Sequence, residues 1–94
     1  MVTRIEYKQT KSRDEAFKKV KAFITPEYLA KFQVKVDLVF DEAKKETVAT
    51  GNGFTMVMKL FDTYCDVDLE LSFLLRPLKS TILGKIEHQI EKNL

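Results

Sequence analysis

Hydrophobic residues recur along this chain with two different periods, and each change of period marks a change of element. Residues 2–9 alternate between polar and weakly apolar positions, with Ile5 and Tyr7 on one side, which predicts a short strand. From Ser12 the spacing becomes helical, and Ser12 and Glu15 have the spacing of a capping box. The apolar face of this predicted helix carries Ala16, Phe17, Val20, Phe23 and Ile24.

Pro26 interrupts this helical pattern. Proline donates no backbone hydrogen bond and crowds the preceding turn, so a helix stops or bends there. Thr25 is a suitable N-cap and Pro26 suits the first position of a new helix. We therefore expect one kinked helix or two helical pieces, the second carrying Tyr28, Leu29 and Phe32.

From Gln33 onward the period is two, which predicts extended chain. Residues 34–40, 47–60 and 65–73 form three extended segments, separated by polar turns at 41–46 and near 62–63. Gly51-Asn52-Gly53 interrupts the second segment and predicts a bulge or a tight bend. The inner face of the predicted sheet carries Val34, Val36, Leu38, Met56, Met58, Val67, Leu69, Leu71 and Phe73.

After Pro77 the apolar residues are four apart, which predicts a helix of about five turns with one narrow stripe. The stripe consists of Leu78, Ile82, Ile86, Ile90 and Leu94. Gly84 inside this helix suggests close backbone packing at that point. The predicted fold is α+β: a two-layer sandwich of order β-α(kinked)-β-β-β-α, an antiparallel meander with the helices on one face.

The composition fits one small globular domain covering residues 1–94. Hydrophobic residues make up 45% of the chain, which is too many for a disordered one. The net charge is +2, but residues 1–35 hold nine Lys/Arg and four Asp/Glu, and residues 36–70 hold three and eight. This asymmetry reflects either solvated helix and sheet faces or an electrostatic arrangement of partners. The single cysteine excludes an internal disulfide and favours a reducing cytoplasm, and the first residues do not resemble a signal peptide.

Candidate chemical groups are few, and each has a simpler structural interpretation. His88, the only histidine, lies on the polar side of the last helix without a suitable set of metal ligands nearby. Cys65 precedes Asp66, whose charge raises the pKa of a thiol and so opposes nucleophilic activity. We expect no catalytic residue, no metal site and no cofactor.

Three further patterns superficially suggest binding. Asp66, Asp68 and Glu70 project from one face of one strand, and with Asp62 they form a hydrated acidic row or a weak cation site. The glycines at 51 and 53 are followed by a strand, whereas a phosphate loop is followed by a helix. The lysines of the first helix lack accompanying exposed aromatic residues, so we expect no nucleic-acid binding.

The outer face of the predicted sheet offers a candidate contact surface. Val39, Val57 and Phe61 point away from the helices if the alternation holds, with Thr55 and Thr47 beside them. Apolar side chains on an open sheet face mark a contact with a partner or with another part of the chain. Because both helical regions are assigned to the opposite face, we predict a protein partner or a homo-oligomer here.

The second half of the chain resembles a known family. The resemblance covers Val36 to Leu94 and rests on the strand ending at Phe40, the G-x-G of ATGNGF, the strand VDLELSF and the junction FLLRPLK before an Ile-rich helix. It is to the putative polyhydroxyalkanoic acid system proteins, short bacterial cytoplasmic proteins linked to polyhydroxyalkanoate storage granules. The chain departs from that family at Pro26 and at Ser72, where glycine is frequent.

The resemblance implies a non-enzymatic accessory or interaction protein connected with polyhydroxyalkanoate granule metabolism or its regulation. The alternative is a carrier of a small apolar ligand, such as a lipid or acyl chain, held between the helices and the sheet. The side chains that would line such a space are Phe17, Phe23, Tyr28, Met56 and Met58, and an ordinary core is the competing interpretation. No apolar run approaches the ~20 residues of a transmembrane helix.

Overall fold

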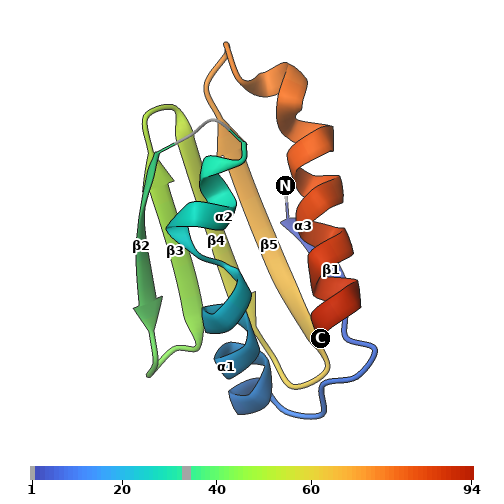
Figure 1. The fold of residues 1–94 in the computed structure, drawn as a ribbon. Coiled ribbons are helices and arrows are strands. Elements are labelled where there is room, and N and C mark those ends of the chain that lie inside the picture. The colour runs from blue at the N-terminus through green and yellow to red at the C-terminus, as the bar shows by residue number, and fades with distance from the viewer. Residues whose placement is uncertain (1, 33–34) are drawn as a thin grey trace.

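In the computed structural model, which describes residues 2–32 and 35–94, three helices cover one face of a five-stranded sheet (Figure 1). The predicted α+β class is confirmed. In chain order the elements are β1 (Val2–Glu6), α1 (Arg13–Phe23), α2 (Pro26–Ala30), β2 (Val36–Asp41), β3 (Glu46–Gly51), β4 (Phe54–Leu60), β5 (Tyr64–Leu71), a short 3-10 turn (Arg76–Leu78) and α3 (Lys79–Asn93).

The sheet is antiparallel throughout, with strand order β1-β5-β4-β3-β2. Four consecutive strands form the meander, whereas the sequence pattern predicted three. The difference arises at Gly51-Asn52-Gly53, which closes a hairpin between β3 and β4, with Gly51 paired to Phe54. Gly53 has φ of +75°, a backbone conformation that glycine adopts without steric cost. The predicted tight bend is therefore the full reversal of a hairpin.

The two predicted helix starts are present. Ser12 accepts a hydrogen bond from the backbone N–H of Glu15 at 3.2 Å, and the Glu15 carboxylate accepts one from the N–H of Lys11 at 3.1 Å. Thr25 accepts a hydrogen bond from the N–H of Tyr28 at 3.1 Å, with Pro26 at the first helical position. The helical region is therefore two pieces, α1 and α2, which reach different parts of the sheet.

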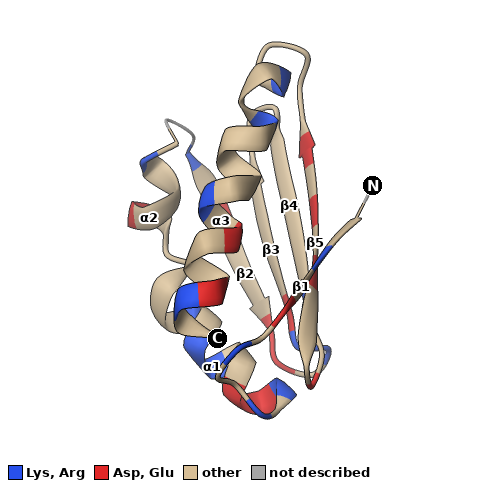
Figure 2. Cartoon of the chain, turned by 90° about the vertical axis from the view of Figure 1, so that its right-hand side faces the viewer, with Lys and Arg blue, Asp and Glu red and all other residues tan. Residues whose placement is uncertain are grey.

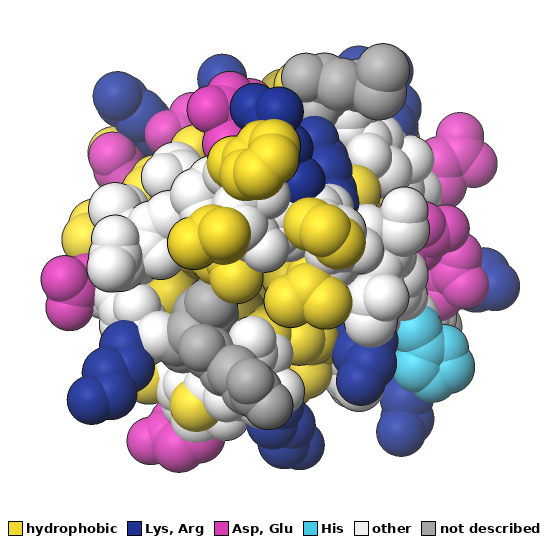
Figure 3. Space-filling view, turned by 90° about the horizontal axis from the view of Figure 1, so that it is seen from above, with side chains coloured by type: hydrophobic (Ala, Val, Ile, Leu, Met, Phe, Trp, Pro, Cys, Tyr) yellow, Lys and Arg dark blue, Asp and Glu magenta, His cyan; other side chains and the backbone are white. Residues whose placement is uncertain are grey.

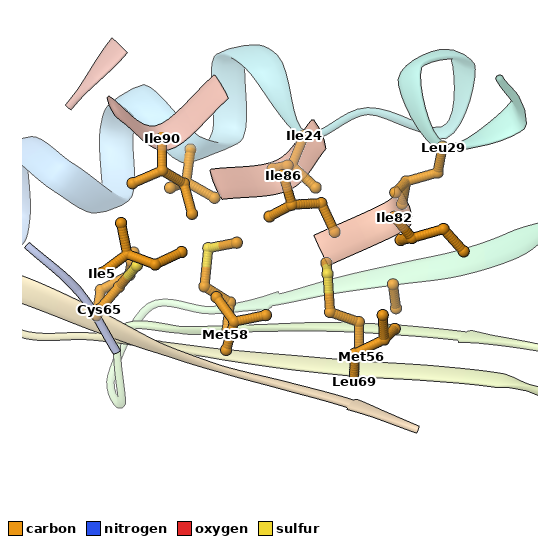
Figure 4. Packing of buried hydrophobic residues seen from close by; sticks show 14 of the residues in the cluster. Ile5, Ile24, Leu29, Met56, Met58, Cys65, Leu69, Ile82, Ile86 and Ile90 are labelled. Atoms are coloured by element: carbon orange, nitrogen blue, oxygen red, sulfur yellow. The ribbon is translucent and has the colours of Figure 1, made fainter. Parts of the chain in front are cut away.

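The core lies between the helices and the inner face of the sheet. Ile82, Ile86 and Ile90 of α3 point toward the sheet side chains (Figure 4). They meet fully buried residues of β4 and β5, among them Met56 and Leu69. Each such side chain stabilises the fold by roughly 1.5–3 kcal/mol relative to an exposed position. The proposed placement of the α3 stripe on the sheet is confirmed for these isoleucines and for Leu94, which is also buried.

Two predictions about the β5–α3 junction are wrong. Phe73 was assigned to the inner face, but β5 ends at Leu71 and the chain turns, leaving Phe73 81% exposed. Leu78 was assigned to the buried stripe, but it belongs to the 3-10 turn before α3 and is 43% exposed. The predicted inner position of Val34 lies outside the described residues.

Candidate functional site

Exposed hydrophobic side chains gather at the end of the molecule where β5 leads into α3. Phe73 is 81% exposed, Leu74 is 85% exposed and Leu78 is 43% exposed; these three residues are called the apolar tip. Figure 3 looks down on this end of the molecule and shows hydrophobic side chains gathered there with lysine and arginine side chains among them. Neighbouring exposed side chains of this size mark a contact surface more often than isolated ones do.

The apolar tip is held by an ordered turn. The N–H of Ser72 donates to the carbonyl of Gly53 at 2.8 Å, which ties the turn to the β3–β4 hairpin. The carbonyl of Ser72 accepts from the N–H groups of Leu75 and Arg76, both at 3.0 Å. Leu75 packs against the core, so the turn has one inward leucine and presents its neighbours outward. The backbone hydrogen bonds therefore hold Phe73 and Leu74 toward solvent.

The chain segment that contains the apolar tip carries charge of one sign. From Leu71 to Ile86 the chain carries three cations, Arg76, Lys79 and Lys85, and no acidic residue. Arg76 lies in the 3-10 turn and Lys79 is the first residue of α3, and blue stretches of the ribbon mark this region in Figure 2. An apolar surface flanked by cations suits an apolar partner that also carries negative charge.

A groove lies between α2 and α3. Tyr28, Lys31 and Phe32, from α2 and the residues just after it, face Gly84, Lys85 and His88 of α3 across a hollow of about 300 Å³. A second hollow, of about 220 Å³, shares Lys31, Phe32 and Lys85 with the first and extends to Leu78. The two hollows therefore adjoin each other. Together they are called the α2–α3 groove, and Leu78 of the apolar tip borders the smaller one.

The walls of the α2–α3 groove are aromatic and its rim is basic. The rings of Tyr28 and Phe32 pack edge to face with centroids 5.5 Å apart. The Tyr28 hydroxyl donates to the backbone carbonyl of Lys85 at 3.4 Å, and burial raises the pKa of that hydroxyl. The described residues that line the two hollows include no Asp or Glu. The groove thus combines an apolar interior with positive charge.

Gly84 does not serve the purpose that the sequence suggested. The pattern predicted close backbone packing at this glycine, but a Cβ atom placed there would have no neighbour within 4 Å among the described residues. Gly84 instead faces the open α2–α3 groove. The prediction was wrong because a glycine in a helix has two possible uses, close approach and open space, and the sequence does not distinguish them.

The predicted contact surface on the outer sheet face is only partly continuous. Val39 pairs with Val48 and Val48 pairs with Val57, so these valines form one row across β2, β3 and β4. Val39 is 60% exposed, and Val57 is half-buried. The expected neighbour Thr47 is instead buried on the inner face. The row remains a prediction for partner contact.

Phe61 is separated from this valine row. It follows the last residue of β4 and stacks on Tyr64 with ring centroids 4.8 Å apart, and the Arg4 guanidinium lies 4.0 Å from the Tyr64 ring centroid. Between Phe61 and Val57 lies a charged row across the sheet, with Lys59 paired to Glu46 on one side and to Asp66 on the other. The three predicted contact residues therefore form two small patches.

The acidic side chains of β5 lie on the outer face, and some of them, like Asp62 just before β5, have hydrogen-bond partners within the chain. Asp66 accepts two hydrogen bonds from the Arg4 guanidinium, at 3.0 and 3.4 Å, in an ion pair across β1 and β5. Asp62 accepts from the N–H of Arg13 at 3.0 Å, at the start of α1. One oxygen of Asp68 is buried and has no hydrogen-bond partner among residues 2–32 and 35–94. Figure 2 shows acidic residues along β5 and β1.

The remaining candidate groups are dispersed. Cys65 is buried, and burial, with a smaller effect of the Asp66 charge, raises the pKa of its thiol to about 12. His88 is exposed and lies at the α2–α3 groove. Within the described parts of the chain, no three His, Cys, Asp or Glu side chains are grouped so as to hold a metal ion. The part of the chain that the structure describes has no helix of sufficient length and apolar character to cross a membrane.

Sequence reasoning missed the apolar tip, although a signal was present. Phe73, Leu74 and Leu75 are consecutive, and a strand turns successive side chains to opposite faces. At least one of them therefore had to leave the inner face.

The chain was compared with family models, with curated proteins and with solved structures, and none of the three comparisons gave a match.

Proposed function

We propose that this protein is a non-enzymatic accessory protein that attaches by its apolar tip to the surface of polyhydroxyalkanoate storage granules and takes part in granule metabolism or its regulation. The observation that carries the proposal is the exposure of Phe73 and Leu74 on a hydrogen-bonded turn. The resemblance of residues 36–94 to granule-associated proteins supplies the setting. A storage granule presents a water-insoluble surface, which is the kind of partner that such a tip suits.

The energetics favour attachment through few residues. Removing a Phe or Leu side chain from water contributes roughly 1.5–3 kcal/mol, and here the side chains are already held outward. Little conformational entropy is lost on binding because the turn is ordered by the contacts of Ser72 with Gly53, Leu75 and Arg76. The cations Arg76 and Lys79 add attraction to a surface that carries negative charge, and this part weakens with salt.

The test is co-sedimentation of the purified protein with isolated polyhydroxyalkanoate granules. The variant Phe73→Ser/Leu74→Ser removes two exposed side chains, and we expect at least a tenfold loss of binding with unchanged thermal stability. The matched control is Val39→Ser, which removes an exposed apolar side chain from the opposite face of the sheet. Equal binding of the tip variant and the wild type would contradict attachment through the tip.

Native mass spectrometry of the same three proteins examines partner contact at the valine row. If this row joins copies of the chain, Val39→Ser lowers the oligomer fraction and the tip variant leaves it unchanged. A wild-type protein that stays monomeric up to high concentration would contradict homo-oligomer formation through the valine row.

The second candidate is a carrier of a small apolar ligand. The observation in its favour is the α2–α3 groove, which opens between the helices. The interior between helices and sheet is occupied by the side chains expected to line a ligand site, since Phe17, Met56 and Met58 pack within the core. Of the expected lining residues, Tyr28 borders the groove. A carrier would therefore bind its ligand in the α2–α3 groove on the surface of the helical layer and not in the interior.

A further inference from the structure

We propose that the α2–α3 groove binds a single aliphatic chain that ends in a carboxylate. In this arrangement the chain lies against Phe32, Gly84 and Ile82, and Lys31 and Lys85 hold the carboxylate. The inference deepens the carrier candidate and rests on it, while it does not depend on attachment through the apolar tip.

The charge of the groove selects the head group. Lys31 and Lys85 line both hollows, so each hollow has two cationic side chains on its walls. No carboxylate belongs to the described residues that line the groove, so nothing there neutralises these lysines in place. The four salt bridges among the described residues involve neither of them. An anionic head group is therefore favoured over a neutral or cationic one.

The interior of the groove selects the chain. Two of its lining residues, Phe32 and Ile82, are buried core residues, and Tyr28 adds an aromatic ring to the lining. From Leu78 to Gln89, the limits of the two hollows along α3, the helix rises by roughly 16 Å at 1.5 Å per residue. The larger hollow, about 300 Å³, is at the lower end of ligand-site volumes. A narrow, elongated site of this size fits one unbranched chain better than a ring system.

Gly84 provides the independent argument. A glycine in the middle of a helix destabilises it relative to alanine, and packing does not require it here because a Cβ atom would meet nothing within 4 Å. A side chain at this position would occupy the groove instead. Glycine at residue 84 thus keeps the groove open at a cost in helix stability, which is the pattern expected of a binding site.

The experiment is a titration of the full chain with dodecanoate, below its micelle concentration, followed by backbone amide chemical shifts. We expect saturable shifts confined to residues 26–32 and 78–93, which contain the lining of the groove. Two matched probes separate the parts of the ligand: acetate has the head group alone, and dodecyltrimethylammonium has the same chain with a cationic head. Both should bind at least tenfold more weakly than dodecanoate. Equal binding of the cationic probe would overturn the assignment of Lys31 and Lys85.

Variants at residue 84 test the groove without threatening the fold. Gly84→Ala and Gly84→Leu both replace glycine with a better helix former, so both should raise the melting temperature. Gly84→Leu should weaken dodecanoate binding at least tenfold because its side chain fills the groove, and Gly84→Ala should weaken it less. A Gly84→Leu protein that binds dodecanoate as the wild type does would overturn the proposal.

Charge variants test the rim. Lys31→Gln/Lys85→Gln should lower the affinity for dodecanoate about fivefold or more, whereas Lys92→Gln, an exposed lysine of α3 outside the groove, should change it less than twofold. The tip variant Phe73→Ser/Leu74→Ser should bind dodecanoate normally. Loss of granule binding with retained dodecanoate binding would separate the two proposals, and shifts confined to residues 72–76 would overturn the groove assignment.

Discussion

The two ends of the β5–α3 region have similar residue types, but the side chains at one end are buried and those at the other are exposed. Along α3, Ile82, Ile86 and Ile90 are buried against the sheet. Just before α3, Phe73 and Leu74 are among the most exposed hydrophobic side chains of the described residues. The difference lies in the backbone: the isoleucines follow helical spacing on one face, whereas the tip residues occupy a turn stabilised by its own hydrogen bonds. Among side chains of similar hydrophobicity, backbone geometry therefore decides which ones are buried.

The largest effect is expected at the centre of the buried end. Ile86→Asp places a carboxylate among fully buried aliphatic side chains, where no cation can reach it at low cost. We expect the variant to lose cooperative unfolding, as measured by circular dichroism and thermal melting. A soluble Ile86→Asp protein with a sharp melting transition would contradict the placement of α3.

A matched pair at the boundary sharpens the comparison. Ile82 is 2% exposed and Leu78, one turn earlier, is 43% exposed. We expect Ile82→Ala to lower the free energy of unfolding by about 2–4 kcal/mol, as truncations in a packed core do, and Leu78→Ala by less than about 1 kcal/mol. Urea denaturation measures both values. Equal losses would show that the buried region begins earlier than the structure places it.

Alkaline pH provides a smaller probe of the buried end. Burial raises the pKa of the Cys65 thiol from 9.0 to about 12. Because the thiol ionises more easily in the unfolded chain, its contribution to stability is complete below pH 9 and is lost as the pH rises toward 12. We expect urea midpoints to fall over this interval, and Cys65→Ala to flatten the first part of the fall. The same slope in both proteins would contradict the burial of this thiol.

The smallest effect on stability is expected at the exposed end. Phe73→Ser/Leu74→Ser removes side chains that contribute little to the core, so the free energy of unfolding should change by less than about 0.5 kcal/mol. The turn itself should persist, because its hydrogen bonds use backbone groups of Ser72 and Gly53. Urea denaturation measures the change in the free energy of unfolding, and amide chemical shifts of residues 72–76 show whether the turn persists. A loss comparable with that of Ile82→Ala would mean that the tip is packed in solution.

Periodicity was sufficient to predict the layers of the fold. Alternation in residues 54–71 assigned Met56, Met58, Val67 and Leu69 correctly to the inner face, and all are fully buried or nearly so. The four-residue spacing in α3 likewise placed its isoleucines. These assignments succeed because one face of a regular element must leave water, whatever the details of packing.

Periodicity failed where the chain changes direction. It did not distinguish a bend from a hairpin at Gly51–Gly53, since both use glycines, and so one strand was not counted. It extended the β5 alternation to Phe73, two residues beyond the end of the strand. The α2–α3 groove was also beyond its reach, because Tyr28 and Gly84 are brought together by tertiary packing alone. The turn at the apolar tip left a partial signal in its consecutive apolar residues, whereas a site made by two helices has no local signature.

The contact between Gly53 and Ser72 has a consequence for how the molecule can change. A Cβ atom at Gly53 would lie 2.7 Å from the Ser72 hydroxyl oxygen, and the residue has φ of +75°. The β3–β4 hairpin, which precedes this loop in the chain, therefore fixes the orientation of the loop that carries Phe73 and Leu74. A change in that hairpin would therefore reorient the loop without any substitution at Phe73 or Leu74.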